Sequence, residues 1–429
     1  MFGFANFLLL ALFAAAVFDL IFALARGGGL RGALHGLWNT PHLLFGQQLA
    51  EWRLQLGRIL FAAGLAAYEI SVVFCNSMAR QNWAWVQGVM SPVLEWLAFL
   101  CFGAKILFGT RYTWRELLAG GALYFIARWV YFNSQNIWWI GIVVAVLAAK
   151  DVSLRRPLQV YFASGCAAMA VVLALHFAGI VAPDLTSERM GALRGTYGYG
   201  HPNTFGGLVF GLVLAYALLR AQKVRWVDCL LVFAVGVFLL VGPASRSAAL
   251  CTLALAVGLV FCRLRAGHSV PHWWPGTCAG MVGLTAAVSY LLPLLVIKVG
   301  PWNNDIGPAW LAKLDSLLTC RISLTWMAYR LLDVKIAGQV FNWPTVDNSF
   351  AFALFQFGPV VAALLGILFA AALWGHAKQG RRVEVCCLFA MLAYAYMEVQ
   401  PFHLTTNPTA LLLCGAVFAQ ASARWQKIE

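Results

Sequence analysis

The chain has 429 residues, of which 62% are hydrophobic and only 11% are charged, and its mean hydropathy is +0.78. So little charge argues against a soluble domain, because repeated apolar stretches of ~17 to 25 residues fit the thickness of a bilayer. The net charge of +14 does not indicate nucleic-acid binding, since basic residues of membrane proteins collect in cytoplasmic loops and contact anionic lipid. We therefore predict an all-α polytopic membrane protein.

In chain order, the apolar stretches predict about 13 transmembrane helices, within a range of 12 to 14. They lie at 4–26, 56–75, 93–110, 117–132, 135–150, 157–181, 204–222, 226–243, 247–262, 276–298, 348–374, 384–400 and 404–422. Residues 1–26 lack the basic start and clear cleavage site of a secretory signal, so we expect them to form the first span. The stretch 27–55 contains Arg31, Pro41 and Arg53, and we expect it to lie along the inner surface.

The basic residues predict the topology. One alternating set of loops and chain ends carries 20 of the 30 lysines and arginines, which places the C-terminus in the cytoplasm and, with 13 spans, the N-terminus outside. The 182–203 loop, the Ser245–Ser247 junction, the long 299–347 segment and the Pro401–His403 turn then share the outer face. Within the long segment, residues 314–332 (LDSLLTCRISLTWMAYRLL) predict a helix on or in the outer leaflet.

Neither the cysteines nor the buried charges of the first half indicate a catalytic centre. The eleven cysteines lie mostly in apolar runs, where they are small hydrophobic residues, and no Cys or His pair has zinc-site spacing in a loop. We therefore expect no disulfide framework, no metal and no cofactor. Glu69 and Arg128 both fall inside predicted spans, and we expect them to form a structural ion pair.

Three arginines in separate segments fall at the outer boundary of the membrane: Arg194, Arg246 and Arg321. A charge at this depth is costly and is commonly paired or functional. Guanidinium groups match phosphate oxygens in a bidentate way, so three of them around one cavity would suit a pyrophosphate. The alternative is that each arginine extends to lipid headgroups independently.

Residues 194–207, RGTYGYGHPNTFGG, interrupt the apolar runs with five glycines around the start of a predicted span. Glycine permits tight turns, and Asn203 is a natural N-cap for a helix that begins near Thr204. A turn and a cap explain most of the pattern without a substrate, but they do not require Arg194 or His201. A helix N-terminus facing an outer cavity would also favour an anion.

Residues 346–358, VDNSFAFALFQFG, lead from the long outer segment into a span. Asp347 and Asn348 stand where a helix would start, so capping is one interpretation. In the other, Asp347 accepts a proton from a sugar hydroxyl as a general base. Acidic residues of the same face, including Asp315, could pair with the arginines or contact sugar.

Taken together, these segments resemble the O-antigen ligase and polysaccharide polymerase superfamily, in particular the capsule and exopolysaccharide polymerases of Gram-positive bacteria. The resemblance rests on residues 194–207, 245–250 (SRSAAL), 314–324 with 337–341 (AGQVF), and 346–358, and it spans roughly residues 185–375. The family's basic motif, an arginine followed four residues later by leucine, falls on Arg246 and Leu250. The ligase motif, a histidine with a glycine eleven residues on, is here Asp347 with Gly358, which looks more like the polymerases.

The resemblance implies a GT-C-like glycosyltransferase in the bacterial plasma membrane with its active site outside. It would take glycan from undecaprenyl pyrophosphate without metal, and other polysaccharide-assembly proteins are possible partners. We expect Arg194, Arg246 and Arg321 to bind the pyrophosphate, and Asp347, or else His201 or His403, to be the base. The further substrate contacts would be Asn203, Ser245, Asp315 and Asn348.

We divide the expected membrane unit into residues 1–181, an N-terminal bundle; 182–375, a core that includes the 299–347 loop; and 376–429, the C-terminal helices. The expected reaction is inverting polymerisation of lipid-linked repeat units. The close alternative is a ligase that moves glycan to another lipid, protein or wall acceptor. A transporter is the alternative from a different class, although transporters place polar residues near the midplane and here they gather at one face.

Overall fold

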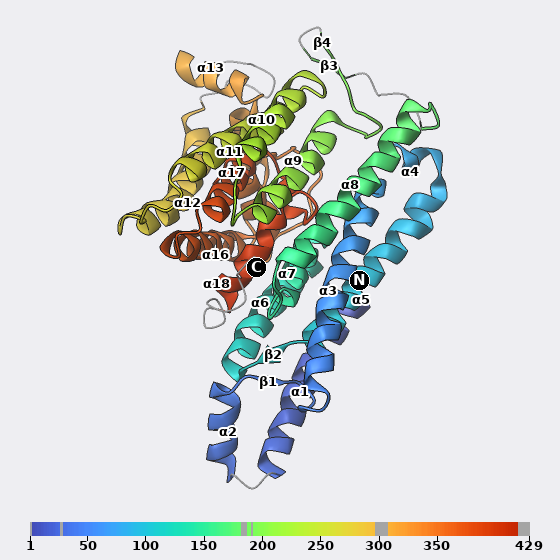
Figure 1. Ribbon diagram of the computed structural model, residues 1–429. Helices are drawn as coiled ribbons and strands as arrows, with labels where there is room; N and C mark the ends of the chain where they lie inside the picture. Colours follow the sequence, from blue (N-terminus) through green and yellow to red (C-terminus); the bar gives the residue numbers. More distant parts are fainter. Residues whose placement is uncertain (1, 26–28, 182–186, 190–191, 297–307, 419–429) are drawn as a thin grey trace.

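The fold was examined in a computed structural model, which describes residues 2–25, 29–181, 187–189, 192–296 and 308–418 (Figure 1). The ends of three predicted spans, at 26, 297–298 and 419–422, and the start of the long outer segment, 299–307, fall outside these residues. Helices make up almost all of the regular structure. The two sheets have two strands each, β1 (His42–Leu43) with β2 (Arg111–Tyr112) and β3 (Ser187–Arg189) with β4 (Ala192–Arg194).

The helices of the first half are α1 (Phe2–Ala25), α2 (Gly29–Asn39), α3 (Ala50–Cys75), α4 (Ala79–Asn82), α5 (Ser91–Phe108), α6 (Trp114–Ser134), α7 (Ile137–Ala148) and α8 (Arg155–Phe177). Those of the second half are α9 (Pro202–Leu219), α10 (Trp226–Val241), α11 (Arg246–Leu264), α12 (Trp274–Leu291), α13 (Ala309–Leu317), α14 (Arg321–Leu331), α15 (Ser349–Phe352), α16 (Pro359–Lys378), α17 (Arg382–Met397) and α18 (Cys414–Val417). Short 3-10 helices at Leu292–Leu295, Gln400–Phe402 and Pro408–Leu413, and π-helical turns at Val86–Met90 and Ala353–Phe357, link some of them.

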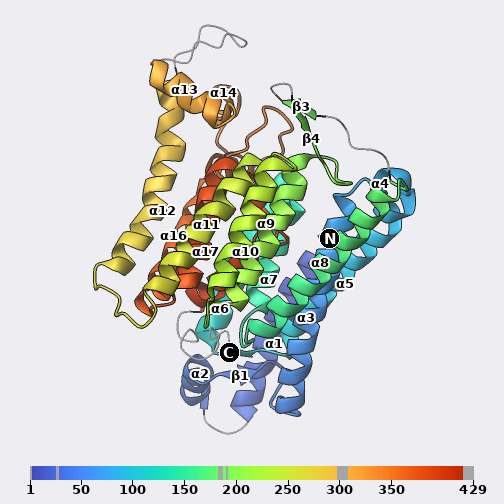
Figure 2. The ribbon, with the colours of Figure 1, turned by 45° about the horizontal axis from the view of Figure 1, so that its top comes forward.

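The helices form two groups that meet along α7. In Figures 1 and 2, α1, α3, α5 and α8 run together on one side, and α9 to α12 with α16 and α17 form the other. Helix α7 contacts α5 in the first group and the 3-10 helix Pro408–Leu413 in the second. Its sequence, IWWIGIVVAVLA, is apolar on every side, as expected of a helix enclosed by protein.

Eight helices are long and apolar enough to cross a bilayer, and three shorter apolar helices accompany them in the described part of the chain. Large apolar side chains such as Phe13, Val227 and Val257 are exposed on their outer surfaces, which suits contact with lipid rather than water. The protein is therefore an all-α polytopic membrane protein, as predicted. The remaining predicted spans include α6, which carries Arg115, Glu116 and Arg128.

Helices α13 and α14 lie over one end of the second group, and α2 lies at the opposite end (Figure 2). We call the first of these the site end. Arg246 begins α11, whereas Arg263 is in its last turn, ~26 Å away at 1.5 Å per residue. The arginines singled out from the sequence and the basic residues assigned to the inner loops are thus separated by a helix length.

Two predicted spans of the C-terminal third are not continuous helices, which corrects the prediction. The span at 348–374 is broken into α15, a π-helical turn and α16, because Gly358 has a φ of 89° and Pro359 begins the next helix. The predicted helix at 404–422 is a turn followed by the 3-10 helix Pro408–Leu413 and the four residues of α18. Proline at 408 again removes a helical donor.

The predicted helix at 314–332 and the predicted ion pair in the first half are also wrong. Residues 314–332 form two helices, since Thr319 and Cys320 adopt left-handed φ values of 63° and 62° between α13 and α14. Arg128 donates from Nε to Asn6 Oδ1 at 2.8 Å instead of pairing with Glu69. An uncharged partner close by on α1 satisfies the arginine, and Glu69 faces α8 instead.

Candidate functional site

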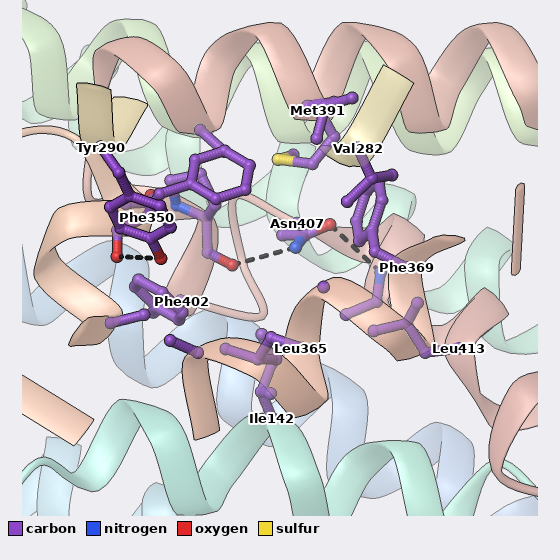
Figure 3. A pocket seen from close by; sticks show the side chains of 18 residues that line it. Ile142, Val282, Tyr290, Phe350, Leu365, Phe369, Met391, Phe402, Asn407 and Leu413 are labelled. Atoms are coloured by element: carbon purple, nitrogen blue, oxygen red, sulfur yellow. Dashed lines mark hydrogen bonds between the residues drawn. The ribbon is translucent and has the colours of Figure 1, made fainter. Parts of the chain in front are cut away.

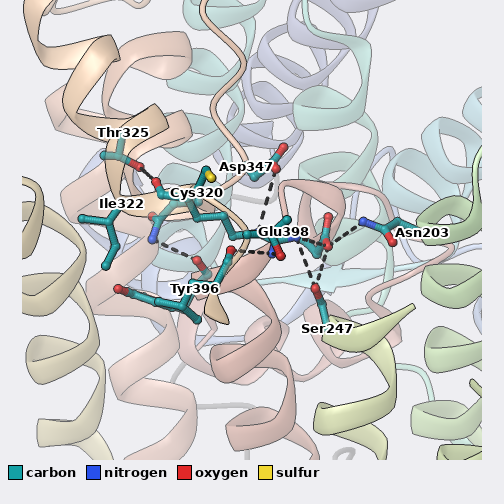
Figure 4. A network of polar contacts seen from close by, with 12 residues as sticks. Asn203, Ser247, Cys320, Ile322, Thr325, Asp347, Tyr396 and Glu398 are labelled. Carbon is teal, nitrogen blue, oxygen red and sulfur yellow. Dashed lines mark hydrogen bonds and ion pairs between the residues drawn. The ribbon is translucent and has the colours of Figure 1, made fainter. Parts of the chain in front are cut away.

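A group of charged and polar side chains meets at the site end (Figure 4). Glu398, one residue beyond α17, is its centre: its Oε1 accepts from Arg321 Nη2 at 2.5 Å, Ser247 Oγ at 2.8 Å and Asn203 Nδ2 at 3.1 Å. We call Arg194, Asn203, Ser247, Arg321, Asp347 and Glu398 the polar cluster. Its members come from five separate segments of the chain, so the tertiary fold alone assembles it.

The turn between α13 and α14 aims Arg321 into the cluster. The buried side chain of Asp315 accepts from the main-chain nitrogens of Ile322 and Ser323 at 2.7 and 3.2 Å and from Ser323 Oγ at 2.8 Å. These bonds cap α14, whose first residue is Arg321, and they use the acceptor capacity of the carboxylate. Asp315 therefore positions Arg321 rather than facing a ligand.

The glycine-rich stretch places Asn203 beside Glu398. The N-cap of α9 is His201, whose Nδ1 accepts from the Asn203 amide at 3.1 Å, so the prediction that Asn203 caps this helix is wrong. Asn203 instead accepts from Arg194 Nη2 at 2.9 Å and donates to Glu398. Close packing requires glycine next to it, because a Cβ on Gly206 would lie 2.2 Å from Ser245 Oγ.

The three predicted arginines all lie at the site end, in different settings. Arg194 and Arg321 are buried members of the polar cluster, and Arg194 also donates to the Ala244 carbonyl at 3.3 Å. Arg246 is half-buried at the start of α11, between Ser245 and the cluster member Ser247. Ser245 is buried, and its Oγ is 3.5 Å from Asn203 Oδ1.

Asp347 and Asn348 have different roles. Asn348 caps α15 by accepting from the amides of Phe350 and Ala351 at 2.9 and 3.0 Å, which agrees with the capping interpretation of this stretch. Asp347 Oδ2 lies 3.9 Å from Arg321 Nε, and its side chain is 31% exposed, so solvent and a ligand can reach this carboxylate. Burial raises the pKa of Asp347, while the charges of Arg321 and His201 oppose that rise.

The environment of Glu398 favours its protonated form even though Arg321 is beside it. Burial raises the pKa of Glu398 to about 7, against the lowering influence of Arg321 and with a further rise from Asp347. Two carboxylates and one buried arginine thus share a small volume, and their charges depend on each other. Such an arrangement can hold or release a proton near neutral pH.

His403 lies outside the polar cluster. Its ring packs against Trp138 with centroids 3.8 Å apart, and Nδ1 is buried with no hydrogen-bond partner among the residues that the structure describes. Burial lowers the pKa of His403 to about 3, so the ring stays neutral at physiological pH. His201 is exposed and near enough to Asp347 to influence its charge. Of the two predicted alternative bases, only His201 is close to Asp347.

The sequence reasoning missed Glu398 and Ser247. Ser247 belongs to the Ser245–Ser247 junction, but its side chain was not distinguished from its neighbours. Glu398 carried a usable signal: it is an acid at the outer end of an apolar stretch, three residues before Pro401. A charge at that depth should have been weighed like the arginines.

The hydrogen-bond donors of Arg321 are largely used within the protein. In the part of the chain that the structure describes, Nη1 donates to the Leu318 carbonyl at 2.9 Å, Nη2 donates to Ser247 and Glu398, and the buried Nε has no hydrogen-bond partner. The Nε–H beside Asp347 is therefore the donor of Arg321 that these contacts leave unused. A bidentate grip on a diphosphate would have to come from Arg194 or Arg246.

An apolar cavity of about 100 Å³ adjoins the cluster (Figure 3). Its walls come from α12, α16, α17 and the 3-10 helix Pro408–Leu413, with Tyr290, Phe369, Met391 and Leu413 among them. Ser349 also lines it and donates to the main-chain oxygen of Glu398 at 2.5 Å, which connects the cavity to the cluster. The site end thus combines charged groups with an adjacent apolar space.

Among the residues that the structure describes, no group of three His, Cys, Asp or Glu side chains could hold a metal ion. No family model, curated protein or solved structure matches the chain. The site must therefore be interpreted from its own chemistry.

Proposed function

We propose that the protein is a glycosyltransferase of the bacterial plasma membrane that polymerises glycan repeat units carried on undecaprenyl pyrophosphate. The polar cluster would face outside, and the C-terminus would lie in the cytoplasm, as the distribution of basic residues favours. The reaction would need no metal and would invert the anomeric carbon.

One observation carries this proposal: separate segments bring Arg194, Arg321 and the carboxylates of Asp347 and Glu398 to one place at the end of a membrane bundle. Buried charges are expensive in a membrane protein, and a lipid-facing surface has no use for them. With Arg246 nearby, the site contains three arginine side chains and two acidic side chains. That balance suits an anionic ligand.

Different side chains would serve the leaving diphosphate and the acceptor hydroxyl in this reaction. Arg194, Arg246 and the Nε–H of Arg321 would stabilise the diphosphate, which leaves with the electron pair of the anomeric C–O bond. The acceptor hydroxyl oxygen forms the new bond to that carbon, and its proton passes to Asp347. Inversion follows because Asp347 activates the acceptor and does not itself attack the sugar.

The apolar cavity supports a lipid-linked donor. A cavity lined by Phe369, Met391 and Leu413 suits hydrocarbon, and its link to Glu398 through Ser349 would place such a chain next to the charged groups. A substrate with a charged diphosphate and an apolar tail would satisfy both regions at once.

Purified protein incubated with a defined lipid-linked repeat unit tests the proposal. We expect a ladder of longer products, and we expect Asp347→Asn and Arg246→Ala to abolish it. Arg330→Ala is the matched control, because Arg330 is exposed on α14 and stacks over Trp326 away from the cluster. Unchanged products from the two cluster-region variants would refute the assignment.

The same experiment separates polymerase from ligase. A reaction that proceeds only after a second acceptor is added, and gives one transfer without a ladder, would identify a ligase that uses the same residues. Consumption of the donor with no glycosidic product would count against both.

A further inference from the structure

Glu69 is a carboxyl group inside the membrane bundle, and it has no charged partner among the residues that the structure describes. It lies in α3, six residues before the helix ends at Cys75, which is ~9 Å from the site end of that helix. Its side chain is 1% exposed, and Oε2 has no hydrogen-bond partner in the described part of the chain. An acid in this position is a candidate functional group by default.

The packing around Glu69 leaves room for a carboxyl group, and the described residues around it supply no cation. Oε1 occupies the space above Gly165 of α8, where a Cβ would approach it to 2.8 Å. The titratable groups around it are Tyr68 of α3 itself, Tyr161 and Cys166 of α8, and Tyr199 of the glycine-rich stretch. All are neutral at physiological pH. A buried carboxyl in such surroundings is far more stable with its proton than without it.

The glycine-rich stretch closes the site end above Glu69. The Met78 amide donates to the Gly198 carbonyl at 2.8 Å, and Ser77 pairs with Tyr199, so this stretch is fixed to the end of α3. The other side of Gly198 packs on Val172 and His176 of α8. The chain therefore bridges the ends of the two helices between which Glu69 lies.

Tyr199 points inward from this bridge. Its side chain is fully buried, and its hydroxyl has no hydrogen-bond partner within the described residues. Burial raises the pKa of Tyr199, and the charge of Glu69 adds to that rise, so the two groups are electrostatically close. A hydroxyl can both donate and accept, which allows it to pass a proton.

We propose that Glu69 and Tyr199 form an intramembrane proton-binding site in which Glu69 holds a proton at neutral pH and exchanges it with the site end past Tyr199. This site is separate from the polar cluster, and it does not depend on the proposed transferase activity. The glycine-rich stretch nevertheless connects the two, because His201 and Asn203 follow Tyr199 by two and four residues. Proton occupancy at Glu69 can thus influence the position of the stretch that supports Glu398.

Labelling with dicyclohexylcarbodiimide tests the proton on Glu69 directly. This apolar reagent modifies protonated carboxyl groups in apolar surroundings: the acid's proton moves to a carbodiimide nitrogen, the carboxyl oxygen attacks the central carbon, and the adduct rearranges to a stable N-acylurea. Peptide mass spectrometry of the full-length protein should locate the adduct on Glu69 at neutral pH, with loss of labelling as the pH is raised.

Glu116 is the matched internal control. It is also buried, but it lies 3.3 Å from Lys150 Nζ. We expect stronger labelling of Glu69 than of Glu116 at neutral pH, because the reagent modifies carboxyl groups that lie in apolar surroundings without a neighbouring cation. Glu69→Gln should abolish that adduct and leave the rest of the labelling pattern unchanged. Equal labelling of the two acids, or none on Glu69 at any pH, would overturn the proposal.

The route past Tyr199 has its own test. In sealed vesicles with the protein in one orientation, the pH is varied on one side while the other is buffered. Labelling of Glu69 should follow the pH on the site-end side, and Tyr199→Phe should slow this response while leaving the final extent intact. A response to the opposite side, or an unchanged rate in Tyr199→Phe, would overturn the route. Neither readout requires a glycan substrate, so failure of the transferase proposal would leave this one standing.

Discussion

Replacing Glu398 with glutamine should destabilise the protein more than replacing Arg321 with glutamine. The two side chains form a buried ion pair at 2.5 Å, with side-chain exposures of 6% and 8%. Removing the carboxylate leaves a guanidinium that cannot lose its proton. Removing the arginine leaves a carboxyl that can take one up, and the pKa of Glu398 is already about 7.

The size of the effect follows from burial. Stranding one partner of a buried pair costs about 3–5 kcal/mol. In Glu398→Gln, Asp347 remains as a weaker counter-ion 3.9 Å from Arg321 Nε. We therefore expect the loss of unfolding free energy in this variant to lie near the lower end of that range. We expect Arg321→Gln to cost less, about 1–3 kcal/mol, since the protonated acid still loses a hydrogen bond. The double variant should be more stable than the sum of the singles predicts, by roughly 2 kcal/mol.

Equilibrium unfolding in detergent should be measured for the wild type, the two single variants and the double variant. A pH about one unit above the Glu398 pKa of about 7 ionises the acid in this experiment. The Arg330→Ala protein controls for loss of positive charge on α14. Additive effects, with a coupling below about 0.5 kcal/mol, would refute the reasoning. So would a larger loss in Arg321→Gln than in Glu398→Gln.

Three further outcomes follow. Asp347→Asn should lower the rate of glycan transfer on the order of 10²-fold or more and leave the free energy of unfolding unchanged. Wild-type activity should fall as the pH drops through the raised pKa of Asp347, because the base must be ionised. Rates of the two proteins measured across a range of pH check both outcomes. His403→Phe should keep activity in the same assay, since that ring is neutral and packed on Trp138. Gly206→Ala should cost about 1–3 kcal/mol in unfolding experiments, because its Cβ would meet Ser245 Oγ at 2.2 Å, whereas Gly283→Ala, with open space around it, should not.

The class of fold could be predicted because apolar stretches report a local property. Each predicted span from 4–26 to 276–298 overlaps an observed helix, with ends that differ by a few residues. The failures occur where the chain leaves helical geometry at proline or in a left-handed turn: at Gly358 and Pro359, at Pro408, and at Cys320. Hydropathy averages over such breaks and does not detect them.

The site could be predicted only in part, because its contacts are long-range. Arg321 and Glu398 are 77 residues apart, and Ser247 and Glu398 are 151 residues apart. Local rules found Asn348 as a cap, but they assigned the same role to Asn203, which the fold uses to join Arg194 to Glu398. The Glu69–Arg128 pair failed for a similar reason: opposite charge suggested contact, while packing gave Arg128 to Asn6.

The central claim is that the cluster and its neighbour Arg246 hold a diphosphate, and an experimental structure with a short-chain polyprenyl pyrophosphate tests it most directly. The account predicts phosphate density within hydrogen-bond distance of Arg246 and of Arg194 or Arg321 Nε, with the hydrocarbon in the apolar cavity beside Ser349. Density for the diphosphate at another surface, with the Arg321–Glu398 pair and Arg246 untouched, would contradict it.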